Sequence, residues 1–266
     1  NSLHITQNVY FDGAEKRISG TDEASRYTQD NGVHSFLVTA AGAADASITW
    51  TTPLKLDVNS RISLSNNDAG DENTVFGFLA GAALASGCNQ NVLFGDEAGN
   101  DLSSGALRNV AIGYSALDLA TGCDDVVAIG ANAIGGAAHG ELGTIAIGSS
   151  ALTSLTSGAR NTAVGYEAGG LTTTGADNTY IGYQAGDDTR DDSKQNTVVG
   201  SLAFAGTHIT ADADDCVAIG YSALGGVLQH ADVAGTVAIG SSALTALTSG
   251  AQNTVIGYQA ADGLTT

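Results

Sequence analysis

Apolar and small residues follow one constant pattern along the chain from about Asn73 onward. Each repeat has Thr, Val or Ile three residues before a glycine and Phe, Ile or Val immediately before it, as in Thr162-Ala163-Val164-Gly165. β-Branched residues at alternate positions favour extended backbone, because their stiff side chains fit a pleated surface. The pattern predicts one short strand before each of these glycines.

The glycine of this pattern recurs eleven times, at intervals of roughly 17–20 residues, as expected of a repeat protein. An alanine always follows it three residues later, and in seven repeats a second glycine follows after nine or ten. Each period is therefore expected to hold two strands and two turns, which make one coil of a solenoid. The repeat glycines are Gly77, Gly95, Gly113, Gly130, Gly148, Gly165, Gly182, Gly200, Gly220, Gly240 and Gly257.

The residue between the two β-branched positions points to the opposite face of the strand. None of these middle residues is charged and ten of the eleven are aliphatic, so both faces of the strand need cover. We expect one face to fill the coil and the other to contact further chains, with the middle residues at a trimer axis or in the core. They are Val75, Leu93, Ala111, Ala128, Ala146, Ala163, Tyr180, Val198, Ala218, Ala238 and Val255.

Stacked coils of this kind predict an all-β fold with two parts. Residues 71–266 are expected to form a parallel β-roll, or β-solenoid, of about eleven coils, on the order of 53 Å long at the usual strand spacing. Residues 1–70 hold the only Trp and the only Pro of the chain. With apolar residues at even positions from Ile48 to Leu64, and a strand candidate at 33–38, they predict a small β-rich module that joins the roll to a larger particle.

Net charge and composition exclude two classes of binding partner. The 28 acidic and 9 basic residues give a net charge of −19, which repels nucleic-acid phosphates and anionic lipid headgroups. We therefore expect no nucleic-acid partner. Membrane insertion is not expected either, because the chain has no run of about 18 apolar residues.

Residue chemistry gives no sign of a cofactor, a metal or catalysis. The chain has no P-loop, HExxH, GxSxG or EF-hand motif, and it is expected not to be an enzyme. Its cysteines form no CxxC pair and its histidines no ligand pair. These residues are Cys88, Cys123, Cys216, His4, His34, His139, His208 and His230.

Two polar features leave an alternative open. The acidic runs at 187–192 and 212–215 are interpreted as solvated turns, against a calcium site or a pair of carboxylates for glycoside cleavage. An asparagine precedes the strand in seven coils and is interpreted as a corner residue, against a ligand-binding ladder. The asparagines are Asn73, Asn91, Asn109, Asn161, Asn178, Asn196 and Asn253.

The strings NTAVGYEAG, NTYIGYQAG, NVAIGYSAL and NTVIGYQA resemble the head repeats of trimeric autotransporter adhesins and, more closely, the repeats of phage and prophage tail fibres. The resemblance covers residues 73 to 261. It implies a left-handed parallel β-roll, three of which associate around a threefold axis. The period is longer here than in the adhesin heads, so the turns must be longer.

The resemblance predicts a structural and receptor-binding segment of a homotrimeric phage tail fibre, located on a virion. Its partners would be itself, other virion or appendage proteins, and a host receptor. The alternative is the head of a trimeric adhesin on a bacterial surface. A tailspike that cleaves polysaccharide and an ice-binding solenoid are further alternatives. Because the chain stops at Thr266, within a coil, we expect the natural protein to continue.

Overall fold

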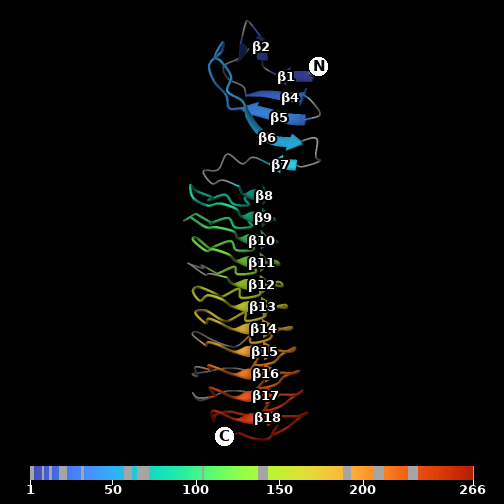
Figure 1. The fold of residues 1–266 in the computed structure, drawn as a ribbon, viewed down its shortest axis with the longest axis vertical. Helices are drawn as coiled ribbons and strands as arrows, with labels where there is room; N and C mark the ends of the chain where they lie inside the picture. The colour runs from blue at the N-terminus through green and yellow to red at the C-terminus, as the bar shows by residue number, and fades with distance from the viewer. Residues whose placement is uncertain are drawn as a thin grey trace. The chain divides into compact units, whose positions relative to one another are not determined.

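The fold is known from a computed structural model (Figure 1). The structure describes the chain outside residues 1–2, 8, 12–13, 18–22, 31–32, 57–61, 65–71, 104, 137–142, 188–192, 207–212, 227–232 and 266. The chain divides into two compact units, Asn1–Asn67 and Asp68–Thr266, close to the boundary expected at residue 70.

The first unit is built on an antiparallel five-stranded sheet. Its order is β1 (Leu3–Gln7), β4 (Ala24–Asp30), β5 (Val33–Thr39), β6 (Thr51–Leu56) and β7 (Ile62–Leu64). A separate hairpin pairs β2 (Val9–Phe11) with β3 (Glu15–Arg17). The strand expected at 33–38 is β5. The burial expected for the even-numbered apolar residues from Leu54 to Leu64 lies outside the described side chains.

One polar cluster ties the first unit together. The Glu15 carboxylate accepts hydrogen bonds from Arg26 Nη1 and Trp50 Nε1, each at 2.5 Å. The Arg26 guanidinium lies 4.7 Å from the centroid of the Trp50 ring. These contacts join the hairpin, the larger sheet and the segment before β6, so the only Trp of the chain has a structural role here.

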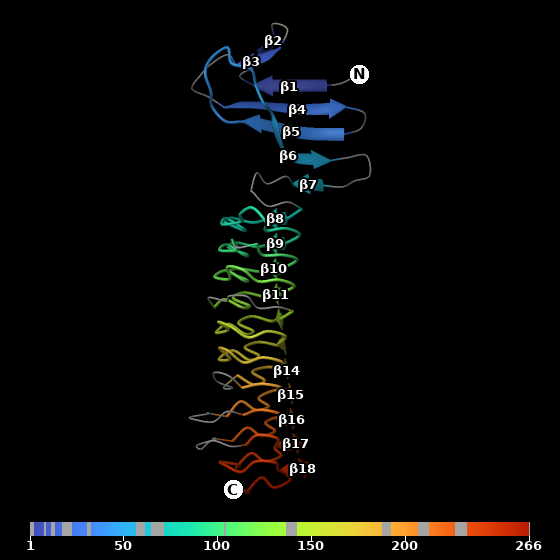
Figure 2. The ribbon, with the colours of Figure 1, turned by 60° about the vertical axis from the view of Figure 1, so that its left-hand side comes forward.

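The second unit is a β-solenoid whose eleven strands form one parallel sheet, stacked in chain order (Figures 1 and 2). The strands are β8 (Thr74–Phe76), β9 (Val92–Phe94), β10 (Val110–Ile112), β11 (Val127–Ile129), β12 (Ile145–Ile147), β13 (Thr162–Val164), β14 (Thr179–Ile181), β15 (Thr197–Val199), β16 (Val217–Ile219), β17 (Val237–Ile239) and β18 (Thr254–Ile256).

The strands pair position by position, so equivalent residues of successive coils form straight columns. Ala111 pairs with Leu93 on one side and with Ala128 on the other. The register survives a change in the length of the repeat. Thr197 pairs with Val217 just as Thr162 pairs with Thr179, although the first of these intervals along the chain is longer. The predicted parallel solenoid is confirmed.

The prediction of two strands per coil is wrong for the described residues. Each coil has one strand of three residues, and the opposite side has only the isolated parallel bridges Asn89↔Leu107 and Leu107↔Asp124. The reason is the backbone of the turns: the second and fourth residues after each repeat glycine have φ between 47° and 63°. Left-handed residues at this spacing end the extended backbone, although the coils remain hydrogen-bonded to one another.

The repeat glycines lie where neighbouring coils approach most closely. They have φ between 130° and 150°. A Cβ on Gly165 would lie 2.2 Å from the carbonyl oxygen of Gly182, and the same clash recurs from Gly77 to Gly240. At Gly257 the nearest atom to such a Cβ would be Ala260 Cβ at 3.5 Å, which is an ordinary contact distance.

The interior of the solenoid is filled by residues of compensating size. Where the middle strand residue is large, the adjoining turns hold glycine: Gly169 and Gly186 adjoin the Tyr180 ring, and Gly81 and Gly99 adjoin Leu93. Most coils with an alanine in the strand instead have a fully buried Leu or Ile at the fourth position after the repeat glycine. These positions are Leu117, Ile134, Leu152, Leu224 and Leu244.

We predict that Gly165→Ala destabilises the solenoid far more than Gly257→Ala. Both substitutions strain a backbone with φ near +140°, which costs about 1–3 kcal/mol. Only Gly165→Ala also drives a methyl group into the backbone of the next coil, which adds roughly 3 kcal/mol. Chemical denaturation followed by circular dichroism measures both losses. Equal losses would contradict a steric role for this column.

Candidate interaction face

The first and third residues of the strands point away from the solenoid interior and together form what we call the outer face. None of its residues is charged, and all are half-buried or exposed. The third-position residues Phe94, Ile147 and Ile181 expose 53%, 37% and 40% of their surface. The first column is Thr74, Val92, Val110, Val127, Ile145, Thr162, Thr179, Thr197, Val217, Val237 and Thr254. The third is Phe76, Phe94, Ile112, Ile129, Ile147, Val164, Ile181, Val199, Ile219, Ile239 and Ile256.

The middle residues lie on the other side of the sheet, inside the coils. From Leu93 to Ala238 each has 0% exposure in a single chain, and the terminal Val75 and Val255 are partly buried against the same core. The expectation that an isolated roll exposes this row is therefore wrong. The three-residue strand leaves its first and third side chains as the outward ones.

Aromatic residues flank the outer face beyond the glycine column. The residue after the repeat glycine is Phe or Tyr in six coils, and all six are exposed. The Tyr166 and Tyr183 rings stack with centroids 5.5 Å apart, and the Phe76 and Phe94 rings of the face itself stack at 5.0 Å. The six flanking residues are Phe78, Tyr114, Tyr166, Tyr183, Tyr221 and Tyr258.

Polar residues border the opposite side of the outer face, at the corner that precedes each strand. Arg108 Nε donates to Asp125 Oδ1 at 2.6 Å, and Arg160 makes the same contact with Asp177 one coil along. The hydrogen bond from Arg108 lowers the pKa of Asp125 below its ordinary value. Exposed pairs of this kind contribute little stability. An apolar strip between polar margins has the anatomy of a protein interface.

The corner asparagines form two buried ladders. Asn178 Oδ1 accepts hydrogen bonds from the backbone N–H and from Nδ2 of Asn196, and Asn178 Nδ2 donates to the carbonyl oxygen of Ser193. The same pattern links the other members, and the two ladders are Asn73, Asn91, Asn109 and Asn161, Asn178, Asn196. Their polar atoms bond to neighbouring coils, which supports the interpretation as corner residues rather than ligand-binding ones.

Metal-ligand chemistry is absent from the part of the chain that the structure describes, where no group of three or more His, Cys, Asp or Glu side chains is placed to hold an ion. The three cysteines are buried and form no disulfide among the described residues, and burial raises the pKa of the Cys216 thiol to about 11. Most of the acidic run at 187–192 and the residues His139, His208 and His230 lie outside the described residues. His34 Nδ1 hydrogen-bonds the Tyr27 hydroxyl.

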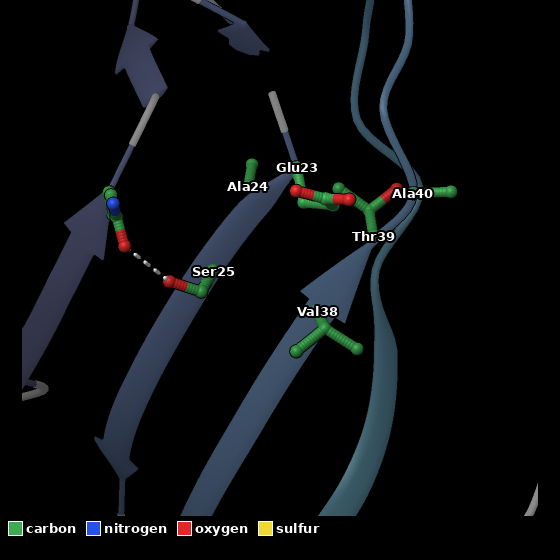
Figure 3. A pocket seen from close by; sticks show the side chains of 7 residues that line it. Glu23, Ala24, Ser25, Val38, Thr39 and Ala40 are labelled. Atoms are coloured by element: carbon green, nitrogen blue, oxygen red, sulfur yellow. Dashed lines mark hydrogen bonds between the residues drawn. The ribbon is translucent and has the colours of Figure 1, made fainter. Parts of the chain in front are cut away.

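A pocket of about 490 Å³ lies in the first unit (Figure 3). It is lined by Gln7, Glu23, Ala24, Ser25, Val38, Thr39 and Ala40. Glu23 is the one titratable residue among the described residues that line it, and Ser25 Oγ donates to Gln7 Oε1 at 3.4 Å.

Comparison with protein-family models, with curated proteins and with solved structures finds no match to this chain. Among the described residues we find no helical segment with the length and apolar character that crossing a bilayer requires. The outer face is the candidate site because its uncharged side chains are half-buried or exposed in a single chain, as at a protein interface.

We predict that Asn178→Ala destabilises the protein by roughly 3 kcal/mol, because it leaves buried donors and acceptors of the neighbouring coils unpaired. Asn253→Ala is the matched control. Asn253 occupies the same corner, yet its side chain makes one hydrogen bond, to the Gly250 carbonyl oxygen. Its loss is expected to be about 1 kcal/mol. Urea denaturation of both variants tests the ladder, and similar losses would show that the inter-coil bonds contribute nothing extra.

We predict that Asp118→Asn stabilises the protein at pH 7 and less so at pH 3. Burial, followed by the charges of Glu97 and Asp101, raises the pKa of Asp118, and its Oδ1 has no hydrogen-bond partner. A raised folded-state pKa means that the protonated form stabilises the fold and that this stability is lost as pH rises through that pKa. Solvent screening keeps the effect small, on the order of 1–2 °C in Tm. Thermal melts at both pH values measure it; a decrease at pH 7 would reverse the argument.

Proposed function

We propose that the solenoid is a structural segment of a homotrimeric phage tail fibre, in which three chains pack through their outer faces. The observation that carries the proposal is a face of twenty-two positions, two in each of eleven strands, without one charge. Monomers rarely expose apolar patches above about 300–600 Å². With each side chain exposing on the order of 50 Å², this face offers about 1,000 Å², which is enough for a stable interface.

The spacing of the face favours a second copy of the same chain as its occupant. Its columns repeat once per coil, about every 4.8 Å, and adjacent rows of side chains leave grooves with the same period. Only a surface with an equal repeat can interdigitate with it along its whole length. Another parallel solenoid of this sequence has that repeat, and closed symmetry then buries the face in every chain.

Three chains suit the width of the face. A strand of three residues places two columns side by side, and a threefold axis lets each narrow roll offer such a strip to a shared centre. The resemblance to tail-fibre and adhesin repeats implies the same number. The net charge of three chains, three times −19 or −57 in total, opposes assembly. The carboxylates lie on surfaces other than the outer face, however, and salt screens their repulsion there.

The location and partners that we propose are inferred from the resemblance to tail-fibre repeats. On a virion, the first unit would attach the fibre to other virion proteins, and the surfaces away from the threefold axis would meet a host receptor. The role is mechanical and adhesive, without catalysis. Antibody labelling of virions, viewed by electron microscopy, tests this location. Labelling of bacterial cells instead would contradict the tail-fibre proposal and favour a surface adhesin.

We predict that Ile147→Asp combined with Ile181→Asp gives folded monomers, whereas Ala146→Asp unfolds the chain. Both isoleucines are on the outer face, so their replacements place carboxylates in the interface only. Ala146 is fully buried inside a coil, where a carboxylate has no partner. Light scattering gives the mass and circular dichroism the fold. The unmodified chain is expected at three times 26.5 kDa.

Either of two results would overturn this proposal. One is an unmodified chain that stays monomeric at micromolar concentration. The other is a double Asp variant that remains a trimer, because the chains would then associate through another surface.

A further inference from the structure

A trimer built on the outer face faces a problem of register, and this inference rests on the proposed function. Strands of the sheet follow one another with one repeated side-chain pattern of Thr, Val and Ile. A chain that slides along its neighbours by one coil, about 4.8 Å, again brings aliphatic residues against aliphatic residues. Repetitive interfaces of this kind need a distinct element to select one alignment.

One element of the outer face breaks the repetition. The third position is Ile or Val in nine strands and Phe only in β8 and β9, the first two strands of the sheet. Phe76 and Phe94 expose 57% and 53% of their surface, and their rings stack with an interplanar angle of 12°. Phe94 remains this exposed although coils lie on both sides of it. The flanking Phe78 exposes 74%.

We propose that the Phe76–Phe94 stack is the register mark of the assembly, with the same stack of a second and third copy of this chain as its partner. When the chains are parallel and aligned, six rings meet at two adjacent levels of the axis, three at each level. Aromatic rings in contact attract one another beyond the effect of the area that they bury. The wider rings also need more space at the axis than Ile or Val, and only in an aligned trimer do all three chains need it at the same two levels.

A slip of one coil removes this match. Phe94 of the displaced chain then lies against Ile112 of its neighbour, in a part of the axis sized for aliphatic side chains. Phe76 of that neighbour loses its aromatic partner. An antiparallel arrangement would place the stack opposite the strands near Ile256, which also lack Phe. The mark therefore selects both the direction and the alignment of the chains.

The experiment measures alignment through a spin label on Ser157→Cys. Ser157 is exposed and lies off the outer face. The native cysteines are buried, so the nitroxide reagent is directed to the new thiol. In the aligned trimer, dipolar EPR is expected to give one narrow inter-label distance. In Phe76→Ile with Phe94→Ile, light scattering should still show a trimer, while the distance distribution broadens toward longer values, because slips in steps of about 4.8 Å along the axis separate labels that the aligned trimer holds at one height.

Two further variants keep the interpretation specific. Ile129→Val with Ile147→Val trims the same column without touching the mark and should keep the single distance. Adding Ile219→Phe and Ile239→Phe to the Phe-to-Ile variant rebuilds an aromatic pair on β16 and β17, whose third positions are adjacent. This variant should recover the single distance.

The outcomes separate the two proposals. A monomeric unmodified chain contradicts the trimer itself. A trimer whose single distance survives loss of both Phe residues contradicts only the register mark. Dissociation of the Phe-to-Ile variant without rescue by the transplanted pair would make the stack a general contact and would equally overturn its role in alignment.

Discussion

The constraint on which the solenoid depends is that every coil must repeat the backbone path of its neighbour at one strand spacing. The Gly113 N–H donates to the Phe94 carbonyl oxygen at 2.9 Å, and Gly130 N–H donates to Ile112 in the same way at 2.8 Å. Hydrogen bonds between coils continue through the turns, where Gly99 N–H donates to Ala116. A side chain that pushed two coils apart at one point would weaken these bonds around the whole circuit. The closest approach therefore requires glycine, and the interior must keep a constant cross-section.

Constant cross-section explains how such different residues share one buried column. Tyr180 and Ala163 occupy equivalent positions in adjacent strands, and both are fully buried. The difference in volume is absorbed across the interior, where glycines adjoin the tyrosine ring. The total side-chain volume inside each coil is therefore constrained, whereas the size of the residue at any one position is not. The asparagines of the two ladders add a polar counterpart, since they satisfy groups of neighbouring coils inside an otherwise apolar interior.

The sequence was sufficient to predict the parallel solenoid, because the glycine period and the β-branched positions follow directly from this stacking. It was insufficient to show which strand face is inside. Ile147 and Ala146 are both apolar, and alternation distinguishes two faces only when one of them is polar. The signal that separates them is the pairing of Leu93 with glycines in the turns and of Ala111 with Leu117, which identifies the middle residues as part of one interior. The second strand was predicted wrongly because the left-handed residues there include Ser115 and Glu97, which carry no glycine-like mark in the sequence.

The same constraint divides the solenoid into a side that cannot vary and a side that can. Strand pairing keeps its register in the coils where the repeat is longer, so the additional residues are accommodated away from the sheet. An insertion within a strand would disturb the columns of the outer face. An insertion in the turns leaves the sheet unchanged. A solenoid built on this plan can therefore alter the surface of its turns while the columns of its sheet stay in line.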